Sequence, residues 1–331
     1  GYKNRNCEKF TRPWRHLEGG LIMVTGTLLT LGGVWVTHLY EARHQHVNFL
    51  AMAHLKASPV VEAFQNTRNF EIESLGLFFE SSEEVKADEF RSYTSYLNRA
   101  SKGLVWGWLP LVTPESRQDF VHHARQEVGA DFDLWEHDAG GQPIPAPERP
   151  RHFPLLYLEP TGPAGGLDIG PGFDLASLDF FSRAFPAAAE KKLPFASDPI
   201  FLGHAVEAPP LVLIFRPVYT SNNQRHLDGF VMGLLEPQKF IQSALNTYFT
   251  PNPLIHMELV ELQEDAPPVR LAATFATNPP PLKRPPPVDQ SKRWILPILT
   301  FGRTYAVVAT PSPEFFHQQI FYAGWLVLLG G

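Results

Sequence analysis

The sequence predicts an α+β fold in which a long N-terminal stalk helix leads into two successive small α/β units, with a transmembrane helix on either side. Three observations carry this prediction. A segment without charged residues lies near the N-terminus, and a second lies at the C-terminal end. Between them, apolar residues recur first with helical spacing and then with strand spacing.

Composition favours a folded chain of about two domains. With 331 residues, 44% of them hydrophobic, the chain is long enough for two buried cores. Its net charge is −6; the first 18 residues hold five Lys or Arg and two Glu, a net +3, which leaves −9 for the remainder. Because an acidic body without a basic stripe binds phosphates poorly, we expect no nucleic-acid partner.

Residue types that build metal or catalytic sites are scarce or poorly spaced. The single cysteine, Cys7, excludes an intrachain disulfide and cannot by itself form a zinc site. The adjacent His122 and His123 diverge on a helix, so we expect no metal and no cofactor. No G-x-S-x-G, H-E-x-x-H or P-loop motif occurs, and no catalytic residue is predicted. An extracytoplasmic hydrolase built on paired carboxylates stays open as an alternative.

Residues 19–40 predict a transmembrane helix. The segment contains no Asp, Glu, Lys or Arg, and its 22 residues span roughly 33 Å as a helix, enough for a bilayer core. A cleaved signal peptide is the alternative, but its apolar core is normally shorter and no convincing A-x-A site follows. The basic residues precede the segment, so residues 1–18 are expected in the cytoplasm. The chain after Tyr40 is then expected on the periplasmic or extracellular side of the inner (plasma) membrane.

Small residues mark one face of this predicted membrane helix. Gly19, Gly26 and Gly33 recur every seven residues, with Thr30 and Thr37 beside them. Such a face allows close helix–helix approach and predicts a homodimer seam. The alternative is that these are the glycines common in any membrane helix.

A second apolar run predicts that residues 314–331 begin another transmembrane helix, because no charged residue follows Phe315. The run is too short to complete a crossing. We therefore expect a cytoplasmic output module, a kinase or a nucleotide cyclase, beyond residue 331. Any enzymatic activity would belong to that module.

Residues 41–104 predict a helical stalk, with Pro59 expected to interrupt it. Residues 105–235 then predict two strands, short helices and three further strands, which is the layout of a PAS-like sheet. A linker helix over 236–252 precedes a second unit over 253–313, so two PAS-like subdomains are expected in tandem. The predicted strands are 105–112, 131–137, 153–160, 194–202, 211–219, 226–236, 255–262, 269–276, 293–300 and 303–310.

Three residues of the first unit are candidates for a ligand site. Asp174 lies in a turn, where a carboxylate either contacts a ligand or caps the start of a helix. Tyr157 shares a strand face with Glu159 and lines either a polar pocket or the core. Arg216 interrupts an apolar strand; if buried it needs an acidic partner or an anionic ligand, and we expect it to point outward.

Seven sequence strings together resemble a known family. In chain order they are ESLGLFFESSEEVKADEF from Glu73, WGWLPLVTPESRQDF from Trp106, FPLLYLEP from Phe153, GFDLAS from Gly172, FRPVY from Phe215, GFVMG from Gly229 and FGRTYAVVATPSPEFF from Phe301. Their order over about residues 70–316 resembles the CHASE domain. That domain is an extracellular sensory domain between two membrane helices in sensor kinases and in diguanylate and adenylate cyclases.

The resemblance implies a ligand site in the membrane-distal subdomain. In the cytokinin-binding members, an aspartate at the position of Asp174 hydrogen-bonds an adenine-type ligand. The pocket wall is implied at Phe195, Ala196, Ser197 and His204. The full set of predicted ligand-binding residues is Asp174, Tyr157, Phe195, Ala196, Ser197, His204 and Arg216.

The sequence as a whole predicts the ligand-sensing input region of a membrane receptor, either a sensor histidine kinase or a diguanylate or adenylate cyclase. The expected partners are a small molecule, for which an adenine-type or cytokinin-like compound is one possibility, the lipid bilayer and a second copy of the chain. The alternative is a membrane-anchored module that recognises a protein partner and binds no small molecule.

Overall fold

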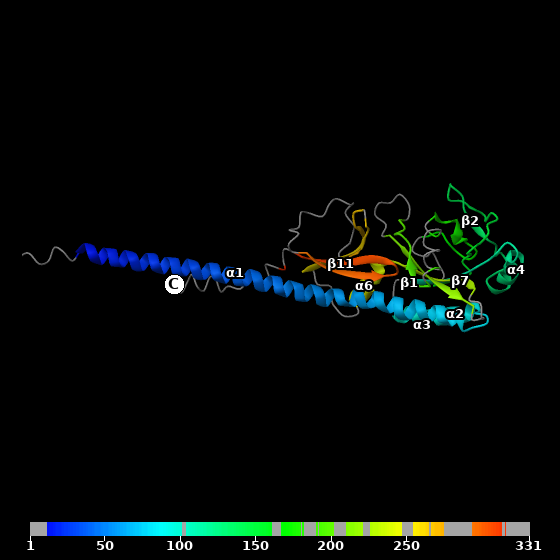
Figure 1. Cartoon of the computed structure of the whole chain (residues 1–331), viewed down its shortest axis with the longest axis horizontal. Helices are drawn as coiled ribbons and strands as arrows, with labels where there is room; N and C mark the ends of the chain where they lie inside the picture. The colour runs from blue at the N-terminus through cyan, green and yellow to red at the C-terminus, as the bar shows by residue number, and fades with distance from the viewer. Residues whose placement is uncertain are drawn as a thin grey trace, which may run out of the picture. The chain divides into compact units, whose positions relative to one another are not determined.

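The computed structural model shows an α+β fold with one long N-terminal helix and antiparallel sheets (Figure 1). It describes residues 12–100, 104–160, 167–179, 181, 190, 192–201, 210–220, 226–246, 254–264, 266–274, 293–312 and 315. The chain divides into two compact units, Gly1–Met52 with Pro311–Gly331, and Ala53–Thr310.

Helix α1, Arg12–Asn66, supplies most of the described part of the first unit. Among the described residues, one helical run, Gly20–Glu80, contains a window long and apolar enough to cross a membrane by length and composition, and none of that window is buried. Thr30 and Thr37 donate hydrogen bonds of 2.9 and 2.7 Å to the carbonyls of Gly26 and Gly33. Both hydroxyls are therefore satisfied within the helix, as an apolar environment requires.

The expected interruption at Pro59 is wrong, because α1 continues through it. Proline removes one helical hydrogen bond but need not end a helix whose next turns are held by packing. Here Ala57, Val60 and Phe64 are buried on one side of the helix. The irregularity falls directly after α1 ends, where Thr67–Glu71 forms a π-helical turn before α2, Ile72–Glu80.

The second unit contains a five-stranded sheet whose strands lie in the order β4-β1-β7-β6-β5. Its strands are β1 (Leu104–Pro110), β4 (Tyr157–Glu159), β5 (Phe195–Ala196), β6 (Val212–Tyr219) and β7 (Leu227–Leu235). Between β1 and β5 lie α4 (Arg117–Glu127), the hairpin β2 (Trp135–His137) with β3 (Pro143–Pro145), and the 3-10 turn η2 (Leu175–Ser177).

The two faces of this sheet pack against different parts of the chain. On one face, α2 packs on β6 and β7, and α3 (Ala87–Ala100) packs on β4. Phe79 of α2 stacks on Trp108 of β1, with ring centroids 4.0 Å apart. The opposite face carries a buried apolar cluster that includes Leu109, Phe153, Leu155, Phe173, Phe181, Leu213, Phe215, Phe230 and Met232.

A four-stranded sheet follows in the order β10-β11-β8-β9, preceded by α6 (Pro237–Asn246). The strands are β8 (Ile255–Leu262), β9 (Val269–Ala273), β10 (Trp294–Thr300) and β11 (Arg303–Pro311). Figure 1 shows β11 and α6 beside the end of α1. There the Phe64 ring contacts Phe240 and Tyr305, with centroids 5.0 and 5.4 Å apart.

Strand β8 has the predicted bounds, whereas three other strands are much shorter than predicted. Of the described residues within 194–202, only β5 is a strand. Of residues 131–137 only β2 is a strand, and it pairs with β3 rather than with the five-stranded sheet. Of residues 153–160 only β4 is a strand. The first half of that segment instead makes backbone hydrogen bonds with the loop around Gly172. The predicted second membrane segment, apart from Phe315, and the proline-rich stretch 278–287 lie outside the described residues.

Candidate functional site

The loop that contains the GFDLAS string is held between two extended segments. Gly172 and Leu175 donate backbone hydrogen bonds to Leu155 and Phe153, and Asp174 donates one to Trp135. Gly172 has a positive φ of 86°, and a Cβ there would lie 2.0 Å from the carbonyl oxygen of Asp133. Glycine is therefore required at this position both by conformation and by the close approach of the neighbouring backbone.

Gly172→Ala is expected to lower the free energy of unfolding by about 2–3 kcal/mol, because alanine is strained at positive φ and its methyl group would push Asp133 away. Gly170→Ala is the matched control, since no atom lies within 4 Å of a Cβ there. We expect that control to change stability by less than about 0.5 kcal/mol. Urea denaturation of both variants measures the difference, and equal stabilities would contradict this account of the loop.

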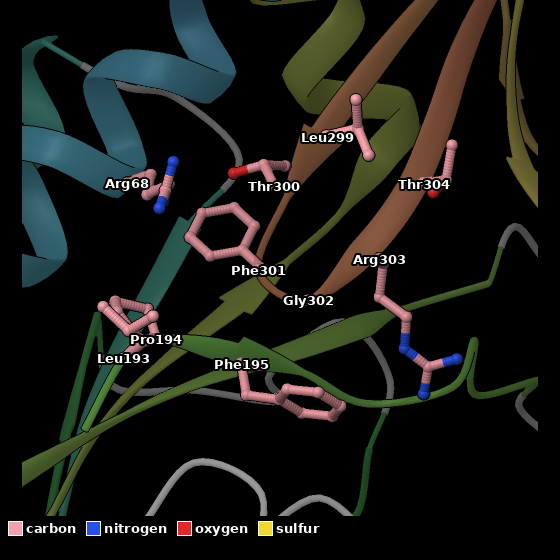
Figure 2. A pocket seen from close by; sticks show the side chains of 10 residues that line it. All are labelled: Arg68, Leu193, Pro194, Phe195, Leu299, Thr300, Phe301, Gly302, Arg303 and Thr304. Atoms are coloured by element: carbon pink, nitrogen blue, oxygen red, sulfur yellow. The ribbon is translucent and has the colours of Figure 1, made fainter. Parts of the chain in front are cut away.

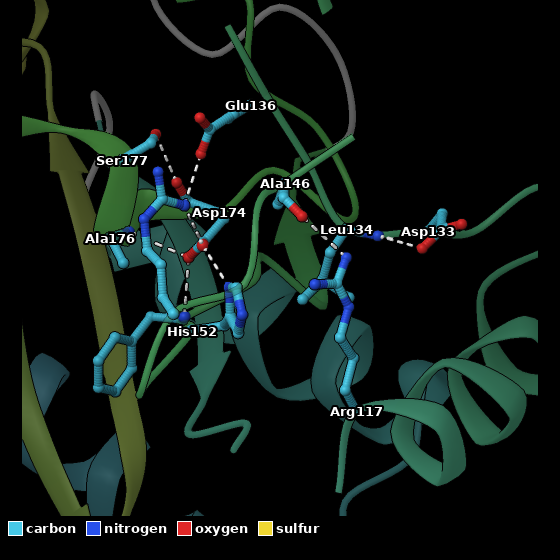
Figure 3. Close-up of polar contacts among 11 residues, drawn as sticks. Arg117, Asp133, Leu134, Glu136, Ala146, His152, Asp174, Ala176 and Ser177 are labelled. Atoms are coloured by element: carbon cyan, nitrogen blue, oxygen red, sulfur yellow. Dashed lines mark hydrogen bonds and ion pairs between the residues drawn. The ribbon is translucent and has the colours of Figure 1, made fainter. Parts of the chain in front are cut away.

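The carboxylate of Asp174 is completely buried and accepts four hydrogen bonds (Figure 3). The backbone N–H groups of Phe153 and Ala176 donate at 2.9 and 3.1 Å. Arg149 Nη1 donates at 3.1 Å, and His152 Nδ1 lies 2.7 Å away. A carboxylate only accepts, so Nδ1 carries the proton. Asp174 thus caps the 3-10 turn η2, which is the capping alternative that the sequence left open.

Two groups around Asp174 extend the network. Arg149 also pairs with Glu136 at 2.5 Å, and this hydrogen bond, with the nearby charges, raises the pKa of Arg149. His152 is fully buried, and its Nε2 has no hydrogen-bond partner in the described part of the chain. This network therefore offers one unsatisfied ring nitrogen. Within the described ranges, no group of three or more His, Cys, Asp or Glu is arranged to hold a metal ion.

Tyr157 lies in the core on the helix-covered face. Its hydroxyl donates a 3.0 Å hydrogen bond to the carbonyl of Val85, and its ring lies 5.4 Å from that of Phe90. Burial raises the pKa of Tyr157, so the phenol stays protonated and keeps donating. Its strand neighbour Glu159 forms an ion pair with Arg91 at 2.7 Å.

The expected outward orientation of Arg216 is wrong, because the residue is only 9% exposed. Its guanidinium lies against α2, 2.6 Å from Glu80 and 3.2 Å from Glu73. The acidic partners that a buried arginine needs are thus supplied by the preceding helix. Gly76 makes room for it, since a Cβ there would lie 2.4 Å from Arg216 Nη1.

The segment around β5 joins the five-stranded sheet to the tip of the β10–β11 hairpin. Ala196 is fully buried, and its N–H donates to Phe301 at 2.9 Å. Ser197 is 1% exposed, and its hydroxyl accepts from Leu213 N at 3.0 Å. Gly302 lies so close to the Phe195 ring that a Cβ would meet it at 2.6 Å. The predicted wall residue His204 lies outside the described residues.

A cleft of about 340 Å³ opens at this junction, and we call it the junction cleft (Figure 2). It is lined by residues 193–195, the hairpin residues 299–304 and Arg68 of the π-helical turn. Phe301 and Gly302, with φ of 52° and 69°, form the two-residue turn of the hairpin. The cleft therefore brings together three segments that are far apart in the sequence.

Comparison with known proteins decides the family. The CHASE domain family matches residues 83–271, more than half of the chain. The chain belongs to the CHASE domain family. No curated protein matches it.

Three solved structures resemble this CHASE protein. The ligand-binding domain of the amino acid chemoreceptor PctC from Pseudomonas aeruginosa PAO1, in complex with GABA, has 12% identity and a TM-score of 0.42, covering 79% of this chain and 98% of that one. The periplasmic sensory domain of the Campylobacter jejuni chemoreceptor Tlp1 has 12% identity and a TM-score of 0.42, covering 83% and 96%. The periplasmic domain of RsbU from Chlamydia trachomatis has 10% identity and a TM-score of 0.37, covering 85% and 98%.

In this CHASE domain the predicted ligand residues that the structure describes lie in three places. Asp174 lies in the polar network, and Tyr157 and Arg216 face the helices. Phe195 lines the junction cleft, and Ala196 and Ser197 are buried next to it in the chain. Sequence reasoning missed Arg149 and His152, although both stand in the polar string directly before the buried Phe153. A cation and an imidazole at the start of an apolar strand were the available signal.

Proposed function

We propose that the chain is the input region of a membrane receptor, which binds a small molecule outside the membrane and signals to a cytoplasmic kinase or nucleotide cyclase. Membership of the CHASE family is the observation that carries this proposal. The apolar window in α1 supports a membrane anchor. The basic residues before it favour a cytoplasmic N-terminus, which puts the sheets on the periplasmic or extracellular side.

Strand order supports two PAS-like subdomains in tandem. Counted along the chain, the strands of the first sheet lie in the order second, first, fifth, fourth, third. This fits the predicted layout of two strands, short helices and three strands. The second sheet repeats the first four positions of that order: its second and first strands, β9 and β8, are followed by its last and last but one, β11 and β10. The proposed subdomains are joined by α6.

The proposed sensory site lies at the Asp174 network. Because Asp174 is fully buried and already accepts four hydrogen bonds, a ligand would reach it through the side chains that it holds. His152 Nε2 is the group that supports this, since it is buried and unpaired among the described residues. Ala196, Ser197 and His204 are proposed to border the site from the β5 side. Tyr157 and Arg216 are assigned instead to holding α2 and α3 on the sheet.

Signalling is proposed to use a dimer whose stalks have two arrangements. Leu55, Phe70 and Leu77 are large apolar side chains of the stalk that are 60%, 67% and 55% exposed, which supports contact with a second copy. A ligand shifts such an equilibrium only by its differential affinity, and a factor of about 100 supplies about 2.7 kcal/mol. The π-helical turn Thr67–Glu71 is the proposed place where the arrangements differ, since such turns are frequent at functional sites.

A membrane-anchored module for a protein partner is the second candidate function. The observation that favours it is the face of the five-stranded sheet opposite α2 and α3, where the rings of Phe153, Phe181, Phe215 and Phe230 pack against one another. These rings occupy part of the space that a small molecule would need. A module of this kind would bind no small molecule.

A thermal-shift screen of the fragment from Glu41 to Pro313 separates the two functions. Adenine derivatives, amino acids, carboxylates and lipids form the panel. One chemical class is expected to raise the melting temperature by about 5–10 °C at a hundredfold excess over its dissociation constant.

His152→Gln should reduce that shift, because the amide cannot reproduce both ring nitrogens. Asp168→Ala should retain it, since the Asp168 side chain is 91% exposed. Absence of any shift across the panel would favour the protein-interaction module.

A further inference from the structure

Two polar groups on the wall of the junction cleft lack a partner in the described part of the chain. Thr300 is 6% exposed, and its hydroxyl oxygen makes no hydrogen bond there. Arg68 is half-buried, and its guanidinium takes part in none of the hydrogen bonds or ion pairs of the described residues. In Figure 2 the Thr300 hydroxyl points to the side of the cleft where Arg68 lies. An unpaired buried hydroxyl is destabilising, so this wall is suited to a hydrogen-bonding ligand.

The other cation of the cleft, Arg303, is already compensated. Its guanidinium lies 2.7 Å from Asp198 and 3.2 Å from Glu261, and its Nε donates to the carbonyl of Ala196 at 3.3 Å. Arg303 therefore holds the hairpin against the β5 segment. Among the described residues, Arg68 is the positive charge of the cleft that has no ionic partner, which favours an anionic occupant.

The rest of the wall is apolar. Phe195, Pro194 and Phe301 line the cleft, and Leu193 and Leu299 are 51% and 76% exposed. An occupant that covered these side chains would remove apolar surface from water. The volume of about 340 Å³ lies at the small end of the range for small-molecule sites.

We infer that the junction cleft binds a small carboxylate with an aromatic or branched alkyl body. The carboxylate pairs with the Arg68 guanidinium and accepts from the Thr300 hydroxyl. The body packs on Leu193, Phe195 and Leu299, which line the cleft. Arg68 belongs to the π-helical turn, and such turns are frequent at functional sites. This site is separate from the Asp174 network and does not depend on the proposed sensory function.

The site is tested by binding of para-fluorophenylacetate to the full chain in lipid nanodiscs. Binding is measured by fluorine NMR of the ligand at millimolar concentration. The wild-type chain is expected to broaden the ligand signal. The neutral amide of the same compound should leave its signal sharp, because it cannot pair with Arg68. Acetate, which lacks the apolar body, should compete weakly.

Three variants locate the binding. Arg68→Met is expected to weaken it at least about tenfold through loss of a charged hydrogen bond, and Arg68→Lys should restore part of the affinity. Thr300→Val should weaken it about 3–10-fold and raise the melting temperature of the ligand-free chain, because it removes an unpaired hydroxyl. Arg43→Met removes an exposed stalk charge outside the cleft and should change nothing.

Three outcomes would overturn the inference: no broadening with the wild-type chain, equal binding of the acid and its amide, or unchanged affinity in Arg68→Met. Loss of affinity in His152→Gln with Arg68→Met unaffected would assign the acid to the Asp174 network instead. Failure here leaves the sensory proposal intact, because the thermal-shift panel tests that proposal at another site.

Discussion

Asp174→Ala is expected to lower the free energy of unfolding by about 3–5 kcal/mol, because it leaves the buried His152 and two backbone N–H groups without their acceptor and removes one of the two ion pairs of the half-buried Arg149. The affected donors are Arg149, Phe153 and Ala176, and His152 loses the partner of its Nδ1. A carboxylate that only contacted a ligand could be replaced with loss of the ligand and no loss of the fold. Complete burial of the carboxylate adds the cost in stability.

Thermal unfolding of the full chain in nanodiscs measures this effect. Asp174→Asn keeps the shape and one acceptor oxygen but removes the charge, so an intermediate loss is expected. Asp168→Ala is the matched control, an aspartate with a side chain that is 91% exposed, and should fall within about 0.5 kcal/mol of the wild type. If Asp174→Ala were as stable as this control, the carboxylate would not hold the loop.

Arg216→Met is expected to lower the free energy of unfolding by about 2–3 kcal/mol. The substitution removes the guanidinium that pairs with both Glu73 and Glu80 of α2. Breaking a fully buried pair costs about 3–5 kcal/mol, and the two carboxylates keep part of their hydration at 33% and 22% exposure, which reduces the cost.

Two comparisons isolate the buried ion pair. Arg91→Met breaks the pair with Glu159, but the Arg91 side chain is 64% exposed, so a much smaller loss of stability is expected. Adding Glu73→Gln and Glu80→Gln to Arg216→Met should recover part of the stability by removing the two negative charges that the guanidinium no longer balances. Urea denaturation of the set checks both. Equal losses for Arg216→Met and Arg91→Met would show that burial does not strengthen the Arg216 contact.

Much of the fold could be predicted from periodicity. The helical spacing of apolar residues indicated the stalk, and the strands at 211–219 and 255–262 were indicated by apolar runs bounded by turn residues. The predicted interruption at Pro59 is wrong because the burial of Val60 and Phe64 outweighs the one helical hydrogen bond that proline removes. Such packing involves Tyr305 and Phe240, which no local pattern around Pro59 reveals.

The candidate site was less predictable than the fold. The motif around Asp174 can be recognised in the sequence, which predicts that the carboxylate either caps a helix or contacts a ligand. Its partners Arg149 and His152 lie 25 and 22 residues away, and only the folded loop brings them to it. Thr300 and Arg68 are ordinary residues in the sequence, and their lack of partners is evident only where the hairpin meets the π-helical turn.

The sequence by itself determined the apolar segment near the N-terminus, the α+β order of elements and the CHASE motifs, because each depends on residues close together in the chain. The tertiary structure alone decided the polar contacts of Tyr157 and Arg216. Tyr157 reaches Val85 across 72 residues, and Arg216 reaches Glu73 across 143. Local propensity and periodicity select an element and its buried face. Which buried polar groups meet depends on how separate elements pack, and a buried charge is stable only where that packing supplies its partner.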